Sequence, residues 1–248
     1  MEGVMRVNAY IDGYNLYDAE KKLNDNRLKW LNLRALCQHF CDNGDKLDKV
    51  YYFTAYANYH KDNPDKAYKI ENHRKYINDF LKGFGVTTKL GKFNKYKKEK
   101  QTDINIALQL YEDAIYNRFD KAFLVTTDTD FVAVINKIKE NNDTKNKQII
   151  ILAPQENNIK SFFEKADEVI YLQRKDFAEH LLPKYGKNGA MMPIYNLLAT
   201  QSEKQSAMQI DYAKKISKDK PFPPPEFPRC PKCKDYLSYE SYEKTKNA

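Results

Sequence analysis

Long apolar runs and cysteines are both scarce in this sequence. No stretch approaches the roughly 20 consecutive apolar residues that a membrane-spanning helix needs. Four cysteines among 248 residues do not make a disulfide framework, which favours a reducing compartment. The N-terminal stretch MEGVMRVNAYIDG runs directly into a strand pattern and lacks the regions of a signal peptide. These absences predict a cytoplasmic protein without a membrane partner.

Histidine is also scarce, whereas positive charge is not. The four histidines share no spacing motif, and we interpret them as structural or solvated. The formal net charge is +8, with 42 lysines and arginines against 34 aspartates and glutamates. This excess favours a polyanionic partner, although a solvated basic surface would explain the charge equally well.

Short apolar runs alternate with amphipathic stretches over the first 180 residues. RVNAYI, KVYYFTAY, KAFLVT and QIIILA are apolar or aromatic almost throughout, and stretches such as TDINIALQLYEDAI repeat apolar residues at helical spacing. A further helix is expected near Asn158–Lys165. Continuous apolar strands separated by helices predict a parallel sheet that is covered on both faces. We therefore expect an α/β, doubly wound domain over residues 1–180.

A C-terminal appendage of different character follows this domain. Residues 181–220 are polar and predict a helical or irregular extension. Residues 221–248 begin with PFPPPEFP, which is typical of a stiff proline-rich linker, and continue into a tail that contains CPKC.

The CPKC motif, with Cys230 and Cys233, is half of a zinc knuckle. Two more thiolates could come from Cys37 and Cys41 if the tail folds back, or from a second copy of the chain in a homodimer. An unmetallated motif is the third possibility. Zinc is therefore a possible second cofactor.

Aspartates follow the predicted strands. TTDTDF comes directly after the apolar AFLV and places Asp128 and Asp130 one residue apart, Asp12 follows the first strand, and Asp103 opens a helix. The carboxyl ends of parallel strands gather at one edge of a sheet. Carboxylates that close repel one another and need a cation, a basic neighbour or full solvation. Each aspartate alone could be a turn or a helix cap, but together they predict a site for Mg²⁺ or Mn²⁺, which prefer oxygen ligands.

Three stretches resemble the signature motifs of the NYN domain. They are YIDGYNLY, KEKQTDINIAL and FLVTTDTDF, and they occur in the order that the family shows, over about residues 5–175. The NYN family belongs to the PIN-like nucleases and includes the LabA-like (DUF88) bacterial proteins. The resemblance implies a PIN-like fold with a central parallel sheet and a ribonuclease that depends on Mg²⁺ or Mn²⁺.

The resemblance also implies roles for single residues. Asp12, Asp103 and Asp128 would hold the metal ion. Asn15, beside Asp12, would position the substrate or a metal-bound water.

Two further residues take roles from the same motifs. Asp130 would be the second acid of the last motif, and Lys100 the basic residue that precedes Asp103. One departure concerns Gln109, which stands where many family members carry another aspartate. Glutamine supplies no charge, so a second tightly bound metal ion is in doubt.

A lysine-rich stretch, KLGKFNKYKKEK, leads into the helix of Asp103. Lysines with interleaved aromatics can neutralise backbone phosphates and stack unpaired bases. The same pattern is also that of a solvated charged loop. The candidate RNA-binding residues are Lys92, Lys95, Tyr96, Lys97 and Lys98.

These observations predict a metal-dependent ribonuclease, most simply an endonuclease, that acts on single-stranded RNA or on structured RNA with exposed loops. Two alternatives stay open. DTDFV fits the D-x-D-x-V pattern of haloacid-dehalogenase-like phosphohydrolases, in which Asp128 would be the nucleophile, but this interpretation leaves Asp12 and Asp103 without a role. The other alternative is an inactive RNA-binding module.

Overall fold

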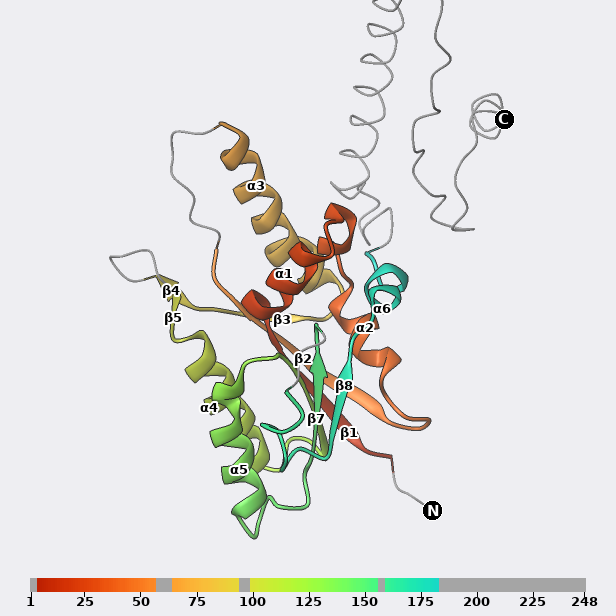
Figure 1. Cartoon of the computed structure of the whole chain (residues 1–248), viewed down its shortest axis with the longest axis vertical. Helices are drawn as coiled ribbons and strands as arrows, with labels where there is room; N and C mark the ends of the chain where they lie inside the picture. Colours follow the sequence, from red (N-terminus) through yellow and green to blue (C-terminus); the bar gives the residue numbers. More distant parts are fainter. Residues whose placement is uncertain (1–3, 57–63, 94–98, 156–158, 183–248) are drawn as a thin grey trace, which may run out of the picture. The chain divides into compact units, whose positions relative to one another are not determined.

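The computed structural model describes residues 4–56, 64–93, 99–155 and 159–182 (Figure 1). For 26–27, 64–69, 92–93 and 99–100 it describes the backbone alone. Apart from residues 181 and 182, the predicted extension over 181–220 lies outside the described residues. The predicted tail over 221–248, with Cys230 and Cys233, lies outside them entirely.

A six-stranded sheet forms the centre of the described domain. Its strand order is β3-β2-β1-β6-β7-β8, and every neighbouring pair is parallel. The strands are β1 (Arg6–Asp12), β2 (Lys46–Thr54), β3 (Thr87–Leu90), β6 (Lys121–Val125), β7 (Gln148–Ala153) and β8 (Glu168–Tyr171). All five residues of β6 are buried, as are five of the six in β7. The predicted parallel sheet is therefore confirmed, and its strands are apolar because both faces are covered.

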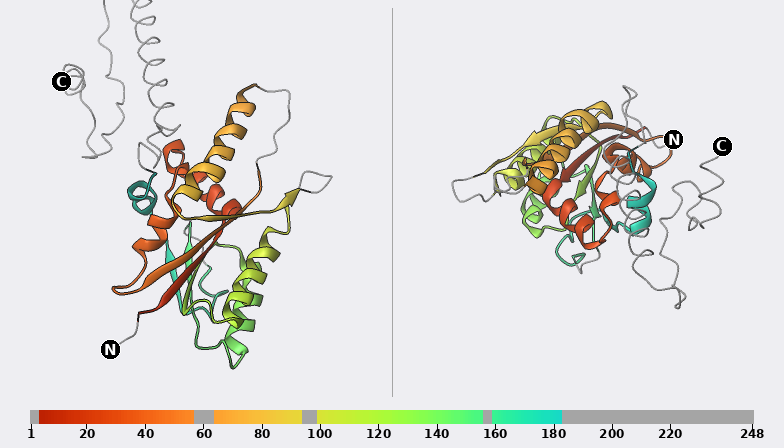
Figure 2. Two further views of the ribbon diagram at one scale, coloured as in Figure 1. Left: turned by 180° about the vertical axis from the view of Figure 1, so that it is seen from behind. Right: turned by 90° about the horizontal axis from the view of Figure 1, so that it is seen from above.

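Helices cover the two faces of the sheet and build two apolar cores (Figure 2). The helical segments are α1 (Gly13–Lys22), η1 (Asn26–Lys29), α2 (Leu33–His39), α3 (Pro64–Lys75), η2 (Tyr76–Leu81), α4 (Thr102–Ile115), η3 (Thr129–Phe131), α5 (Val132–Glu140) and α6 (Arg174–Glu179). Side chains from α1, α2 and η2 pack on one face, and α4 and α5 lie side by side on the other. Among these helices, none is both long enough and apolar enough to cross a bilayer.

One expected helix does not form in the described residues. Between Ile159 and Ala166 the chain makes turns, held by backbone bonds such as Phe162 N–H to Ile159 O (2.9 Å) and Ala166 N–H to Phe163 O (3.0 Å). The two side chains that suggest a helix, Ile159 and Phe163, are buried. Two successive turns therefore place both side chains in the core as well as a helix would.

Helix α1 approaches the end of β2 very closely at Gly13. A Cβ atom on Gly13 would lie 2.6 Å from the carbonyl oxygen of Phe53, 2.8 Å from the Tyr52 ring and 2.9 Å from the Cβ of Thr54. No other residue type fits at this distance. The glycine therefore lets α1 begin immediately after β1 and keeps Asp12 against the neighbouring strand.

Candidate active site

The predicted acidic residues gather where the winding of the sheet reverses. β1 lies between β2 and β6; the chain leaves β1 into α1 on one face of the sheet and leaves β6 toward α5 on the other. In open parallel sheets such a reversal opens a crevice beyond the carboxyl ends of the strands. Asp12 ends β1, and Asp128 follows β6 by three residues, so both flank this point.

Asp12 is a buried carboxylate that also caps a helix. Its Oδ1 accepts the backbone N–H groups of Tyr14 (3.1 Å) and Asn15 (3.0 Å), and its Oδ2 accepts the hydroxyl of Thr126 (3.3 Å). The residue is only 3% exposed. A carboxylate offers about four lone-pair sites, so Oδ2 keeps one for a further partner.

The other carboxylates act on Asp12 through their charge. The pKa of Asp12 is raised to about 6, chiefly by burial and also by the charges of Asp103 and Asp128. The hydrogen bonds from Asn15 and Thr126 lower it in part. Partial burial raises the pKa of Asp103, and the charges of Asp128 and Asp130 raise it further. The structure thus brings the four predicted acids within electrostatic range of one another.

The two threonines before Asp128 hold the site together. The hydroxyl of Thr126 donates to Asp12 and accepts the backbone N–H of Asp128 (3.0 Å). The backbone N–H and the hydroxyl of Thr127 both lie 3.0 Å from Oδ1 of Asn15. Sequence analysis did not assign these residues, although their hydroxyls stand directly before the acids. This explains why TTDTDF places hydroxyls at the end of a buried strand. The two hydroxyls join the end of β6 to Asp12 on β1 and to Asn15 on α1.

The amide of Asn15 is oriented by this bonding. Its Oδ1 accepts two bonds from Thr127, so its Nδ2 points away as a donor, and it has no hydrogen-bond partner among the described residues. Gln155, at the end of β7, donates to the hydroxyl of Thr127 (3.4 Å), and Lys22 donates to Gln155 (2.7 Å). No local pattern in the sequence links Gln155 or Lys22 to the acids, so neither residue could be expected at the site from the sequence.

The chemistry of this cluster fits a divalent cation, although the ligands are not yet gathered. The charges that raise the pKa of Asp12 and Asp103 are all carboxylates, which is the situation that a bound cation relieves. In the described part of the chain, however, no three His, Cys, Asp or Glu side chains form a group that could hold a metal ion as they stand. Asp103 and Asp130 are exposed and can turn, whereas Asp12 is fixed by its three hydrogen bonds.

The middle of the lysine-rich stretch, residues 94–98, lies outside the described residues. The stretch begins in β3, and the segments on either side of 94–98 form an antiparallel pair, β4 (Lys92–Phe93) with β5 (Glu99–Lys100), which leads into α4. The remaining candidate RNA-binding residues fall within 94–98, outside the described residues, and of Lys100 only the backbone is described. Lys100 and Asp103 are three positions apart in the sequence, on either side of the junction between β5 and α4.

Gln109 is bound to a buried carboxylate rather than to the acid cluster. Its Nε2 donates to Oδ1 of Asp113 (3.0 Å), a residue that is fully buried. Asp113 also accepts the hydroxyl of Tyr10 (2.7 Å) and the guanidinium of Arg118 (2.9 Å). The amide nitrogen of Gln109 therefore makes a hydrogen bond inside the domain, to Asp113 and not to the acid cluster.

Comparison with known proteins identifies the family. A model of the NYN domain matches residues 6–173, a span that holds all four aspartates. The chain is 43% identical over 47 residues to 6-hydroxy-3-succinoylpyridine 3-monooxygenase HspA of Pseudomonas putida (strain DSM 28022 / S16); this segment is 19% of the chain and 15% of that relative. A crystal structure of a protein of unknown function from Vibrio parahaemolyticus RIMD 2210633 aligns with a TM-score of 0.49 at 17% identity, over 73% of this chain and 99% of that one. Because the NYN match covers well over half of its length, the chain belongs to the NYN domain family.

Proposed function

We propose that this protein is a ribonuclease that depends on Mg²⁺ or Mn²⁺ and cuts RNA internally. Membership of the NYN family indicates a PIN-like nuclease that acts on RNA. The observation that carries the finer proposal is the buried Asp12, whose pKa is raised by burial and by the charges of Asp103 and Asp128. Such a group of acids at a sheet's carboxyl edge is suited to phosphodiester hydrolysis with a cation.

In this proposal Asp12, Asp103 and Asp128 hold the cation, and Asp130 completes the acidic set. A bound divalent cation would polarise the phosphoryl oxygens and lower the pKa of a water molecule for in-line attack. Asn15 would direct its free amide N–H toward the substrate or that water, since Thr127 fixes the amide oxygen.

Lys100 is proposed as the basic residue nearest the chemistry. The backbone of β5 ends at Lys100 and α4 begins at Thr102, so a single residue separates the lysine from the helix that carries Asp103. An ammonium group there would neutralise charge on the RNA phosphate during cleavage.

Replacement of single acids tests the proposed chemistry. With total RNA and Mn²⁺, wild type should cleave, and Asp12→Asn, Asp103→Asn and Asp128→Asn should each lose nearly all activity while remaining folded. Asp143→Asn is the matched control, because Asp143 is exposed on a loop after α5. Near-wild-type cleavage by Asp12→Asn or Asp128→Asn would refute the assignment.

Further measurements on the same variants separate the two alternatives. A phosphohydrolase with Asp128 as nucleophile would hydrolyse small phosphate esters, bind fluoroberyllate at Asp128 and tolerate Asp103→Asn. An inactive RNA-binding module would bind the RNA pool without metal-dependent cleavage.

The lysine-rich stretch is proposed to follow the RNA backbone. Replacement of Lys92, Lys95, Lys97 and Lys98 with glutamine should lower the log–log salt dependence of single-strand binding by about 0.7 per lost contact. KM should rise with little change in kcat, since substrate and transition state share this binding. Tyr96 would add stacking on an unpaired base. Parallel salt dependences for wild type and the quadruple variant would identify the stretch as a solvated loop.

Three predictions from the sequence stay as they were made. Zinc binding by Cys230 and Cys233 and a homodimer built on shared CPKC motifs both depend on residues outside the described part of the chain. A cytoplasmic location also stays a prediction.

A further inference from the structure

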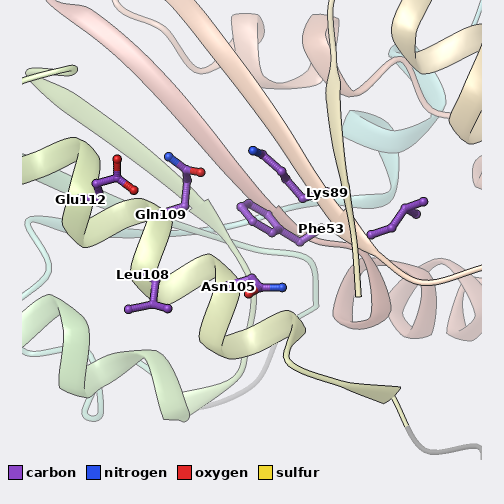
Figure 3. A pocket seen from close by; sticks show the side chains of 7 residues that line it. Phe53, Lys89, Asn105, Leu108, Gln109 and Glu112 are labelled. Atoms are coloured by element: carbon purple, nitrogen blue, oxygen red, sulfur yellow. The ribbon is translucent and has the colours of Figure 1, made fainter. Parts of the chain in front are cut away.

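A hollow of about 300 Å³ lies beside the acid cluster, between α4 and the ends of β2 and β3. In Figure 3 the side chains of Lys89, Gln109 and Asn105 surround the Phe53 ring. The full lining is Phe53, Lys89, Leu90, Asn105, Leu108, Gln109 and Glu112.

The strand register connects this hollow to Asp12. Asp12 is paired with Phe53 across β1 and β2, and Phe53 is paired with Lys89 across β2 and β3. Parallel strands lie about 4.8 Å apart, so the three residues form one row across neighbouring strands. Ile11 pairs with Val125, which puts Thr126 next to Asp12 and extends the row to β6.

Helix α4 lies along the same row of strand ends and contributes residues to both the acid cluster and the hollow. Its first turn carries Asp103 and Asn105 and its second turn carries Gln109, and both amide side chains line the hollow. One helix and one row of strand ends therefore bound both the acid cluster and the hollow.

The lining combines apolar contact with polar groups of defined direction. The floor is Phe53, and Leu90 and Leu108 stand at the open sides, 42% and 61% exposed. A carboxylate accepts hydrogen bonds only, so Asp113 holds the amide nitrogen of Gln109 and leaves the Gln109 oxygen directed into the hollow. Among the described residues, the amide of Asn105 has no hydrogen-bond partner.

Charge sets the direction in which a nucleotide would lie. Lys89 has a cation–π contact with Tyr51 (5.9 Å) and no ion pair among the described residues. Glu112, at the other end of the hollow, is paired with Arg118 (3.0 Å) and would repel a phosphate. A phosphate therefore belongs beside Lys89, and a base belongs between the amides.

We propose that this hollow binds one unpaired nucleotide of the RNA, next to the phosphodiester that the acid cluster cleaves, and that Asn105 and Gln109 select its base. This inference rests on the proposed ribonuclease function. Unpaired bases are recognised by contact with aromatic or apolar side chains and by hydrogen bonds to their edges, and the hollow offers both. Lys89 contacts the backbone phosphate of the same nucleotide.

Two variants and two controls test the pocket. Asn105→Ala removes the free amide, and Lys89→Gln removes the cation. Asn142→Ala, on the loop after α5, and Lys46→Gln, at the opposite end of β2, make the same changes away from the hollow.

Cleavage sites on a mixed-sequence single-stranded RNA are the first measurement. Wild type should show a base preference at one position beside the cut, and Asn105→Ala should weaken that preference about tenfold, as loss of one base-reading amide predicts. Asn142→Ala should cut like wild type. Identical cutting patterns for Asn105→Ala and wild type would overturn the proposal and leave the ribonuclease assignment intact.

Binding of short RNA oligonucleotides without divalent metal is the second measurement, and it does not need cleavage. Measured by fluorescence anisotropy in the Asp12→Asn background, Lys89→Gln should lower the log–log salt dependence by about 0.7, and Lys46→Gln should not. If neither wild type nor any variant cleaves RNA, the ribonuclease assignment fails. The binding measurement then tests the nucleotide pocket by itself. Equal affinities and salt dependences for both pocket variants and both controls would then overturn the pocket.

Discussion

A single carboxylate at Asp12 serves both the fold and the proposed chemistry. Its hydrogen bonds to Tyr14 and Asn15 start helix α1, while its burial beside other acids makes its charge unfavourable. Helix capping by aspartate stabilises a protein by about 1 kcal/mol. The raised pKa of Asp12 works against this, because the charged form is the one that burial disfavours.

Stability should therefore fall as the pH rises through the pKa of Asp12. The folded-state pKa of about 6 lies above the ordinary 3.8, so the protonated carboxyl favours the fold. This contribution is complete below pH 3.8 and is lost as the pH passes 6. Urea unfolding in EDTA should show wild type losing about 2.5 kcal/mol relative to Asp12→Asn between pH 4 and pH 7.5. Asp143→Asn should follow wild type, and parallel curves for wild type and Asp12→Asn would contradict the assignment.

Gln109 should contribute to stability through Asp113. Gln109→Glu would replace a donated hydrogen bond with a second carboxylate facing a fully buried one. We expect a loss of about 1–3 kcal/mol in the free energy of unfolding. Gln38→Glu, at an exposed position of α2, should change it by less than about 0.5 kcal/mol. Equal effects in the two variants would mean that the amide bond to Asp113 does not stabilise the fold.

At the scale of elements, the site depends on how closely α1 passes β2. Gly13 allows this approach, and the turn that it opens carries Asn15 and donates two backbone N–H groups to Asp12. A shift of this turn by a few tenths of an ångström would move the acid and the amide together.

Gly13→Ala should therefore reduce both stability and activity. The added methyl group would contact backbone and side-chain atoms of β2 at under 3 Å, and overpacking of this kind costs about 1–3 kcal/mol. Gly83→Ala is the control, because its Cβ has no neighbour within 4 Å and its backbone is helical. That variant should unfold at the same or a higher temperature. Calorimetry and RNA cleavage of both variants check the prediction, and a fully active, stable Gly13→Ala would contradict it.

Elements with a complete local pattern were predictable from the sequence. KAFLV has four consecutive apolar residues after Lys121, so its assignment as a buried strand did not depend on its neighbours. The helix expected near Asn158–Lys165 does not form in the described residues, because turns there bury Ile159 and Phe163. Asp12, Asp128 and Asp130 stood out in the sequence because they lie at or just after the ends of such strands, whereas Asp103 opens helix α4.

Contacts between distant segments were not predictable. Lys22 and Gln155 are 133 positions apart, and their bond depends on α1 lying beside the end of β7. The hollow beside Lys89 likewise depends on the register of β1, β2 and β3 and on the side of α4 that lines it. No periodicity in the sequence indicates which of these distant segments lie next to each other.

For the whole molecule, a divalent cation should act as a stabilising ligand. The acids come from β1, α4 and the segment after β6, and they do not yet form a ligand group. A cation that gathers them binds only the folded chain, and at 100 times its Kd this contributes about 2.7 kcal/mol. Thermal unfolding should shift upward by about 5 °C or more with Mn²⁺ at that concentration, and EDTA should reverse the shift. Asp12→Asn should show no shift and Asp143→Asn the full one; no shift in wild type would argue against a bound cation.

The pairing of β6 with β1 has a consequence for the growing chain on the ribosome. β1, β2 and β3 are neighbours in the sheet and are made first, whereas β6 starts at Lys121 and inserts beside β1 from the other side. Until β6 has been made, the nascent chain holds Asp12 without Asp128 or the threonines that join the two strands. A domain generally folds as a unit during synthesis, and this domain is not complete until β6, β7 and β8 have been made. The proposed ribonuclease site is therefore incomplete while the first 120 residues are being made beside ribosomal and messenger RNA.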